Sequence, residues 1–297
     1  MNQIRYDIDL FVELNEHYSR SSAAVEHASA IKRKDRNPLE DTTKRIAQVD
    51  KYLHFKKGMR VLEIGCGRGH LSSLLKQDYG CEVVGVDIRT YPEWEEFQSE
   101  GLDLRIHDIS AMSNDGLGTF DRIVSLAVWE HMEHPYAGLT AVNDLLKPAG
   151  QGVAYISANL YRGPKASHRY REVFFPWPHL LFEDDVFEEF YRRQGRNNVR
   201  AAWVNKLTVA HYEMYLRQLD FEVVRQWTTG TPIDEEFYQR FIDKLGRYPR
   251  YDLEQDFLHM VIASKRPLQS RPHGRLSSSY LRWRLRTLGD LVRGVRR

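Results

Sequence analysis

The sequence contains little that would place the protein outside the cell or across a membrane. Only two of its 297 residues are cysteines, Cys66 and Cys81, so a disulfide framework is excluded and a reducing compartment is expected. No segment approaches the roughly 18 consecutive apolar residues of a membrane-spanning helix. The first ten residues lack the apolar core of a secretory signal. We therefore expect a cytoplasmic protein.

The net charge is close to zero, but the charge is distributed unevenly. The chain has 43 Lys and Arg residues against 41 Asp and Glu, a formal net charge of +2. Residues 265–297 contain ten of the basic residues and a single acid, Asp290, so this tail carries +9 and the preceding part of the chain −7. An acidic body makes nucleic acid an unlikely partner, because phosphate-rich ligands favour basic surfaces.

Alternating strands and helices predict the fold. After Gly58, short apolar runs alternate with amphipathic stretches of helical length, which is typical of βαβ units in a parallel, doubly wound α/β sheet. Before them, residues 1–54 are predicted to be helical with a break at Asn37-Pro38. The predicted strands are 60–64, 82–87, 102–107, 120–126, 152–157, 221–227 and 257–264, and the predicted helices are 71–77, 137–146, 207–219 and 234–245.

Residues 158–205 interrupt this alternation. They are rich in proline and aromatic residues, and we expect an irregular aromatic loop rather than a regular layer. Its most aromatic part, residues 174–182, is predicted to form a lid over an acceptor site, because long loops at the carboxyl side of such sheets are usually functional. The alternative is a packed plug at the sheet edge.

A glycine turn follows the first predicted strand. Gly65, Gly67 and Gly69 stand between this strand and the next helix, where positive φ angles and a close approach of ligand to backbone are required. His70 occupies the position of the third glycine in the dinucleotide fingerprint, which weakens a nicotinamide or flavin interpretation. The absence of a following Gly-Lys-Ser/Thr excludes a P-loop.

Acidic residues end the next two strands. Asp87 lies 20 residues beyond Gly67, where a carboxylate can accept hydrogen bonds from a ribose diol. Asp108 could accept from an adenine amino group, with Ile109 packing on the ring. The fourth strand leads into residues 126–132, which include a Glu-His pair, and Leu-Lys-Pro-Ala-Gly follows at 146–150.

In this order the motifs resemble the class I S-adenosylmethionine-dependent methyltransferases. The resemblance covers residues 58–160, and the strands at 221–227 and 257–264 fit the family's terminal antiparallel hairpin. It implies a Rossmann-like, seven-stranded sheet that binds S-adenosylmethionine. The resemblance implies that the methionine part of the cofactor is surrounded by Glu63, Gly65, Cys66, Gly67 and Gly69. It implies that the ribose and adenine are bound by Asp87, Ile88, Asp108 and Ile109. On the sulfonium side it implies Leu126, Ala127 and Glu130.

Transfer of a methyl group to a hydroxyl needs a base, for which histidine is the usual residue. The predicted catalytic candidates are His131, in the Glu-His pair, and His168 and His179, in the aromatic loop. An equal alternative for His131 is that it only orients its loop. Glu130, His131 and His134 also have the spacing of a small metal cluster, but no second carboxylate lies nearby in sequence, so no metal is predicted.

The predicted acceptor is a hydroxyl of a glycan, an envelope lipid or another small molecule. A quinone-type hydrophobic small molecule, an RNA, and a non-catalytic cofactor-binding role are the alternatives. Residues 280–297 combine an apolar helical stripe with arginines, which suits an anionic membrane surface on the inner face. Docking on the body or in an oligomer, and binding of nucleic acid, are the alternatives for this tail. The predicted domains are a helical cap (1–54), the methyltransferase domain (55–264, with a 158–205 insertion) and the basic tail (265–297).

Overall fold

The computed structural model describes residues 4–21, 38–166, 172–196 and 203–267. The chain divides into two compact units. Unit 1 comprises residues 1–37, 159–209 and 228–258, and unit 2 comprises residues 38–158, 210–227 and 259–297. His168 and the membrane-binding segment predicted at 280–297 lie outside the described residues.

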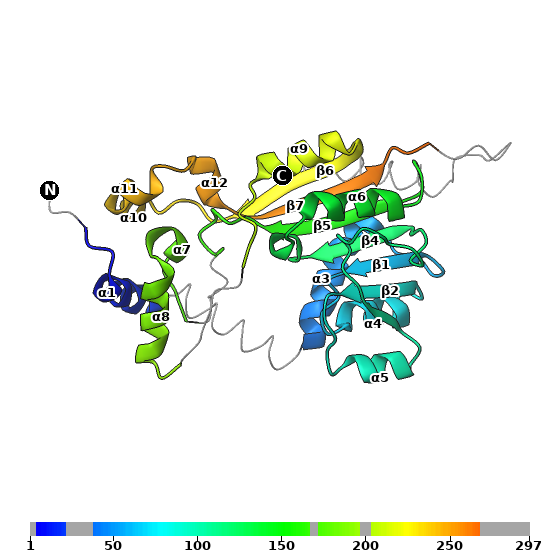
Figure 1. The fold of residues 1–297 in the computed structure, drawn as a ribbon, viewed down its shortest axis with the longest axis horizontal. Coiled ribbons are helices and arrows are strands. Elements are labelled where there is room, and N and C mark those ends of the chain that lie inside the picture. The colour runs from blue at the N-terminus through cyan, green and yellow to red at the C-terminus, as the bar shows by residue number, and fades with distance from the viewer. Residues whose placement is uncertain (1–3, 22–37, 167–171, 197–202, 268–297) are drawn as a thin grey trace. The chain divides into compact units, whose positions relative to one another are not determined.

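A seven-stranded sheet with the order β3-β2-β1-β4-β5-β7-β6 forms the framework of the fold (Figure 1). β1 pairs in parallel with β2 and β4, β2 with β3, and β4 with β5. β6 and β7 form an antiparallel hairpin at one edge, so the predicted Rossmann-like sheet is confirmed. The strands are β1 (Arg60–Ile64), β2 (Glu82–Asp87), β3 (Asp103–Ile106), β4 (Arg122–Leu126), β5 (Val153–Asn159), β6 (Phe221–Gly230) and β7 (Gln255–Ser264).

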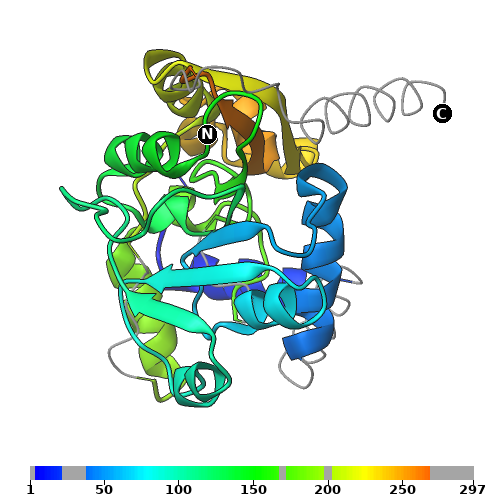
Figure 2. The same cartoon turned by 90° about the vertical axis from the view of Figure 1, so that its right-hand side faces the viewer.

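Helices of unit 2 cover the sheet with apolar side chains. α3 (Pro38–Leu53), α4 (His70–Gln77) and α5 (Trp94–Ser99) share one hydrophobic core with alternate residues of the central strands. Figure 2 shows α3, in blue, beside the cyan strands of this sheet. α6 (Pro135–Leu145) and α9 (Val209–Gln218) contact each other through the rings of Tyr136 and Tyr215, whose centroids are 5.3 Å apart. No helix among the described residues is long and apolar enough to cross a membrane.

A buried arginine joins α3 to the sheet. The Arg122 guanidinium, at the start of β4, donates to the carbonyl oxygens of Leu53, Asp121 and Gln151. The Leu53 carbonyl is one of those at the end of α3 that have no partner within the helix. Burial lowers the pKa of Arg122 to about 10, so the side chain still carries its charge at neutral pH.

Unit 1 is built from short helices around aromatic side chains. Phe11, on the first helix, is fully buried, and its ring centroid lies 4.8–5.1 Å from those of four other phenylalanines: Phe175, Phe182, Phe187 and Phe190. These distances are typical of packed aromatic pairs. The helices are α1 (Ile8–Ser19), α7 (Pro178–Leu181), α8 (Asp184–Arg193), α10 (Glu235–Arg240), α11 (Ile242–Leu245) and α12 (Arg250–Glu254).

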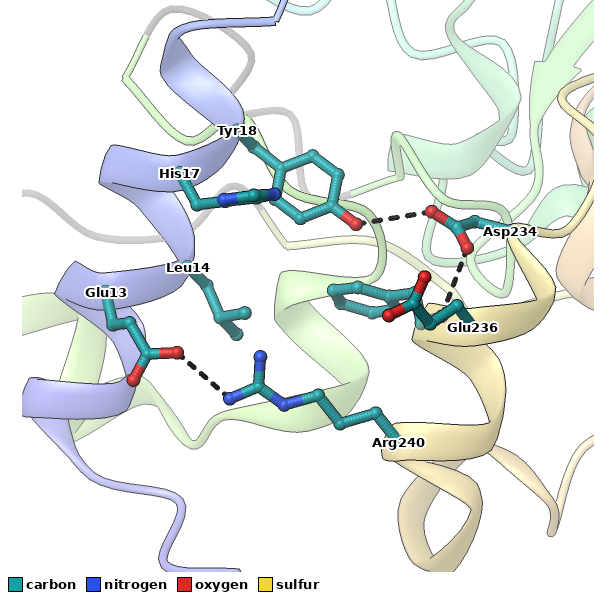
Figure 3. Close-up of a pocket in the computed structure, with 8 residues that line it drawn as sticks. Glu13, Leu14, His17, Tyr18, Asp234, Glu236 and Arg240 are labelled. Atoms are coloured by element: carbon teal, nitrogen blue, oxygen red, sulfur yellow. Dashed lines mark hydrogen bonds and ion pairs between the residues drawn. The ribbon is translucent and has the colours of Figure 1, made fainter.

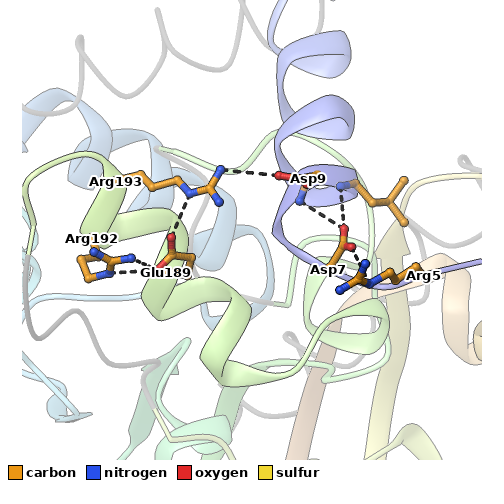
Figure 4. A network of polar contacts seen from close by, with 7 residues as sticks. Arg5, Asp7, Asp9, Glu189, Arg192 and Arg193 are labelled. Atoms are coloured by element: carbon orange, nitrogen blue, oxygen red, sulfur yellow. Dashed lines mark hydrogen bonds and ion pairs between the residues drawn. The ribbon is translucent and has the colours of Figure 1, made fainter.

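Polar contacts hold α1 within unit 1. The Asn15 side-chain amide donates to the Glu172 carbonyl at 2.9 Å and accepts from the Phe174 backbone amide at 2.8 Å, so it satisfies two backbone groups of a segment outside the regular elements. On the surface, Asp7 caps α1, while Glu189 pairs with Arg192 and Arg193 (Figure 4). Exposed pairs of this kind contribute little, about 0–1 kcal/mol each, so the aromatic core decides the stability of the unit.

Two sequence predictions are wrong. Residues 158–205 are not simply an irregular loop, because α7 and α8 form within them. α8 places Phe187, Phe190 and Tyr191 on one buried face, a helical spacing that the surrounding prolines and aromatics conceal. The single helix predicted at 234–245 is divided at Phe241, where α10 ends and α11 begins.

Candidate functional site

The glycine turn connects β1 to α4. Gly65, Gly67 and Gly69 all have positive φ angles, +72°, +52° and +88°. The amides of Gly65 and Cys66 both donate to the Val86 carbonyl of the neighbouring strand, at 2.8 and 3.0 Å. The turn therefore stays attached to the carboxyl end of β2, and only residues that tolerate left-handed backbone suit the three positions.

One side of this turn is packed and the other is open. A Cβ atom added at Gly65 would lie 2.3 Å from a methyl carbon of Val128, so the loop after β4 packs directly on this glycine. A Cβ added at Gly67 would have no atom of the described residues within 4 Å. The face of Gly67 on which a side chain would stand is therefore open to a ligand, as the predicted cofactor requires.

Asp87 and Ile88 lie beside the open side. Asp87 is the last residue of β2, and its Oδ2 accepts a hydrogen bond from the Gly67 amide at 2.9 Å. Its Oδ1 accepts a longer hydrogen bond, 3.3 Å, from the Arg89 amide. The next side chain, Ile88, is 73% exposed. A carboxylate oxygen and an accessible apolar side chain in succession fit a ribose and an adjoining flat ring.

The two residues predicted to recognise adenine differ in exposure. Asp108 follows β3 and is exposed, with Oδ1 accepting from the amide and the hydroxyl of Ser110 at 2.9 and 2.7 Å. Ile109 is 3% exposed, so its side chain belongs to the core. The Asp108 carboxylate is already oriented, whereas apolar contact with a ring is available from Ile88 rather than from Ile109.

Glu63 is a buried acid beneath the glycine turn. It lies in β1, is 8% exposed, and accepts a hydrogen bond from the Ser72 hydroxyl of α4. Loss of hydration raises its pKa to about 8; the Ser72 hydrogen bond lowers it, and the nearby Asp87 charge raises it. Burial also raises the pKa of the Cys66 thiol, so this cysteine is not a reactive thiolate. A cationic group of a ligand near Glu63 would favour its ionised form.

The loop after β4 completes this edge of the sheet. Leu126 is half-buried, and Ala127 is exposed with a φ of +55° and donates to the Ser157 carbonyl at 3.1 Å. Glu130 is 2% exposed within the short 3-10 helix Trp129–His131. Because β1 pairs with β2 and β4, the ends of these strands bring the glycine turn, Asp87 and the loop after β4 together. These residues fit the predicted cofactor.

The two histidine candidates among the described residues belong to different units of the chain. His131 is exposed at the end of the short helix after β4. His179 belongs to unit 1, where its Nε2 lies 2.6 Å from the Tyr161 carbonyl and its ring contacts the Tyr161 ring. Within the described residues, no group of three or more His, Cys, Asp or Glu side chains is placed to hold a metal ion.

Three neighbours of the glycine turn were not predicted from the sequence. Trp94 donates from its indole to the Gly67 carbonyl at 2.8 Å, Ser72 binds Glu63, and Val128 fills the space over Gly65. Ser72 is the third residue of α4, and Val128 is adjacent to the predicted loop residues. Their positions in the sequence alone could therefore have suggested both as neighbours of the site. Trp94 has no such signal, because its contact depends on how α5 packs against the sheet.

A separate cavity lies within unit 1, between α1 and α10 (Figure 3). Its volume is about 380 Å³. Glu13 pairs with Arg240 at 3.0 Å, and the Tyr18 hydroxyl donates to Asp234 at 3.4 Å. Burial and the Asp234 charge raise the pKa of Tyr18 to about 12, so it remains a neutral donor. The cavity is lined by Glu13, Leu14, His17, Tyr18, Asp234, Glu236, Phe237 and Arg240. None of these is a site residue predicted from the sequence.

Comparison with known proteins gives one family and several relatives. Residues 31–226 match the family described as "Methyltransferase domain". A ubiquinone biosynthesis O-methyltransferase of Cereibacter sphaeroides is 36% identical over 114 residues, 37% of this chain and 44% of that protein. A cyclopropane-fatty-acyl-phospholipid synthase of Escherichia coli is 34% identical over 142 residues, 46% of this chain and 36% of that protein. The chain thus spans less than half the length of either relative.

Among solved structures, a coclaurine N-methyltransferase bound to N-methylheliamine and SAH has the same fold. The TM-score is 0.50 at 17% identity, and the match covers 75% of this chain and 72% of that one.

Proposed function

This chain belongs to the methyltransferase domain family, and we propose that it transfers the methyl group of S-adenosylmethionine to a hydroxyl of a small hydrophobic or lipid-linked acceptor. The observation that carries the proposal is the open space over the Cα of Gly67, near Asp87, Ile88 and Glu63 at the carboxyl edge of the sheet. Ligands of open α/β sheets bind at this edge.

Different residues of unit 2 would bind different parts of the cofactor. Asp87 would receive the ribose hydroxyls through Oδ1, since Oδ2 already binds the glycine turn. Asp108 and Ile88 would border the adenine, and Glu63 would balance positive charge at the methionine end. When bound, S-adenosylmethionine supplies an electrophilic methyl group with a good leaving group, so that positioning provides much of the rate enhancement.

His131 is the proposed base. Its exposed imidazole lies in the loop that follows β4, beside the proposed cofactor site, and a neutral imidazole can accept the proton of an acceptor hydroxyl near pH 7. The names of the relatives support a hydrophobic or lipid-linked acceptor: one is a ubiquinone biosynthesis O-methyltransferase and the other is a cyclopropane-fatty-acyl-phospholipid synthase.

Methyl transfer from labelled S-adenosylmethionine tests the acceptor class. A polyprenylated catechol, a phospholipid vesicle with unsaturated acyl chains, and a glycan fraction serve as acceptors, and the site of the label is read by mass spectrometry. Label on a hydroxyl oxygen of the catechol or of a lipid-linked glycan supports the proposal. Label on acyl-chain carbon or on nitrogen, with none on oxygen, contradicts it.

His131→Ala tests the base. We expect kcat to fall at least about 100-fold, because general base catalysis contributes factors of this size, while the Kd of S-adenosylhomocysteine stays the same. His211→Ala, at an exposed position on α9, is the matched control and should retain the wild-type rate. Equal rates in the two variants would show that His131 only orients its loop.

A further inference from the structure

The most tightly specified backbone in the candidate site is that of Gly67. Its amide donates to Asp87 Oδ2 at 2.9 Å, and its carbonyl accepts from the Trp94 indole at 2.8 Å. The amide and the carbonyl belong to the two successive peptide planes that meet at the Gly67 Cα. Anchoring both planes fixes φ and ψ together, and so selects one conformation for a residue that otherwise has many.

Both anchors come from one stretch of chain. Asp87 ends β2, and Trp94 is the first residue of α5, seven positions later. Between them, Glu93 forms an ion pair with Arg68, the neighbour of Gly67, at 3.3 Å. Further along α5, Phe97 lies against Gly69, where an added Cβ would come within 3.2 Å of its ring. The segment from β2 into α5 therefore contacts the whole second half of the glycine turn.

The Trp94 side chain is built for this contact. It is buried within the core of unit 2, and its indole N–H is its single hydrogen-bond donor. A buried indole nitrogen normally needs an acceptor, and here the acceptor is a loop carbonyl rather than a regular element. Packing of the indole ring in the core thus sets the position of its N–H, and the hydrogen bond from this N–H holds the Gly67 carbonyl in place.

We propose that Trp94 is a positioning residue for the cofactor, which holds the Gly67 backbone in its binding conformation together with Asp87. The proposal rests on the proposed function, since it assumes that the glycine turn receives S-adenosylmethionine. Without the indole donor, the Gly67–Arg68 peptide is free to rotate, and the bound conformation must be selected at the moment of binding. The entropic cost of fixing one residue corresponds to about a tenfold loss of affinity.

Trp94→Phe tests the proposal, because it keeps an aromatic ring and removes the donor. We expect the Kd of S-adenosylhomocysteine, measured by calorimetry well below the unfolding temperature, to rise about tenfold. Hydrogen–deuterium exchange should accelerate in the peptide covering residues 65–69 and stay slow in β1. Trp94→Leu, a second donor-free variant, should behave in the same way if Trp94→Phe folds poorly.

Trp177→Phe is the matched control. The Trp177 indole is also buried and donates to the Leu253 carbonyl at 3.1 Å, but it belongs to unit 1, whereas the glycine turn belongs to unit 2. It should lose stability through the same lost hydrogen bond while keeping the wild-type Kd. Equal Kd values for the wild type and Trp94→Phe, or equal losses in both tryptophan variants, would overturn the proposal.

Different results would reject the proposed function and the positioning role of Trp94. If the wild-type protein does not bind S-adenosylhomocysteine, the proposed function is wrong. In that case the exchange measurement still decides the role of Trp94: unchanged exchange at residues 65–69 in Trp94→Phe would overturn the positioning role as well.

Discussion

The two units of the chain are stabilised by different means. In unit 2, backbone ladders between parallel strands set the framework, and positive-φ glycines shape the turn at its edge. In unit 1, the helices are short and the common feature is a core of aromatic side chains around Phe11. A backbone framework leaves a surface of fixed shape at the strand ends, whereas a side-chain core depends on each ring that fills it.

The difference extends to the site residues. Every cofactor-binding residue predicted from the sequence belongs to unit 2, while His179 and the cavity between α1 and α10 belong to unit 1. Unit 2 thus holds all the residues to which we assign the cofactor.

The largest expected effect comes from breaking the aromatic core. Phe11→Ala removes the ring that contacts four other phenylalanines, and we expect a loss of about 3–5 kcal/mol in the free energy of unfolding. Calorimetry should show a separate, earlier transition for unit 1. Titration with S-adenosylhomocysteine should give the wild-type Kd, because its predicted contacts lie in unit 2.

Phe120→Ala is the counterpart in unit 2. Phe120 is also fully buried, precedes β4 and packs under the Arg60 guanidinium at 4.4 Å. A similar loss of stability is expected, but here the affinity for S-adenosylhomocysteine should fall with it. Loss of binding in Phe11→Ala as well would show that the two units unfold as one, and the contrast between them would disappear.

Alanine substitutions at two glycines of the same turn, Gly65 and Gly67, should differ in their cost to stability. Gly65→Ala places a methyl group 2.3 Å from Val128 at a φ of +72°, and should cost about 2–4 kcal/mol of stability. Gly67→Ala meets no described atom within 4 Å and should cost about 1 kcal/mol, from its positive φ alone. Thermal unfolding measures both.

Gly67→Ala should have a large effect on cofactor binding, although its effect on stability is small. Its added methyl group enters the space assigned to the ligand, so the Kd of S-adenosylhomocysteine should rise by more than about tenfold although the protein remains folded. A wild-type Kd for Gly67→Ala would mean that the open space is not the ligand's.

The sequence predicted most where local pattern and tertiary structure agree. β1 and β2 have the predicted bounds, because apolar runs of this length end at a glycine turn and at a charged residue. α8 was missed because its apolar spacing lies within a proline- and aromatic-rich stretch that suggests a loop. The i, i+3, i+4 spacing of Phe187, Phe190 and Tyr191 is the pattern that indicates this helix, whereas the composition of the stretch does not.

The candidate site shows a different limit of the sequence. Asp87 was predicted to face a ligand, and its carboxylate also binds the Gly67 amide. Trp94 was not predicted at all, because no spacing rule links an indole to a carbonyl 27 positions earlier. Such contacts depend on the angle at which α5 packs on the sheet, which a local pattern does not determine.

Asp87→Asn tests the carboxylate that both the turn and the cofactor would use. The amide oxygen of asparagine can still accept from Gly67, so the fold should keep nearly its full stability. Loss of a charged acceptor for the ribose hydroxyls should weaken S-adenosylhomocysteine by about 1.5–3 kcal/mol in calorimetry. Asp103→Asn, at the amino end of β3, is the control and should bind normally; equal affinities in the two variants would reject the ribose assignment.

The effect most specific to unit 2 is a pH dependence from Glu63, which appears only as a slope of stability with pH. Burial raises its pKa to about 8 from 4.5, so the folded state holds a proton that the unfolded state loses between these values. The stabilising contribution is complete below pH 4.5 and is lost as pH rises toward 8, with a slope of up to about 1.4 kcal/mol per pH unit. Glu63→Gln should remove this slope from denaturant unfolding curves, and Ser72→Ala should extend it to higher pH, because the Ser72 hydrogen bond lowers the pKa. Glu82→Gln, exposed at the start of β2, should leave the slope as in the wild type. A slope unchanged by Glu63→Gln would mean that water reaches this carboxyl group in the folded protein, and the glycine turn would then lie over a hydrated site rather than over the core of the sheet.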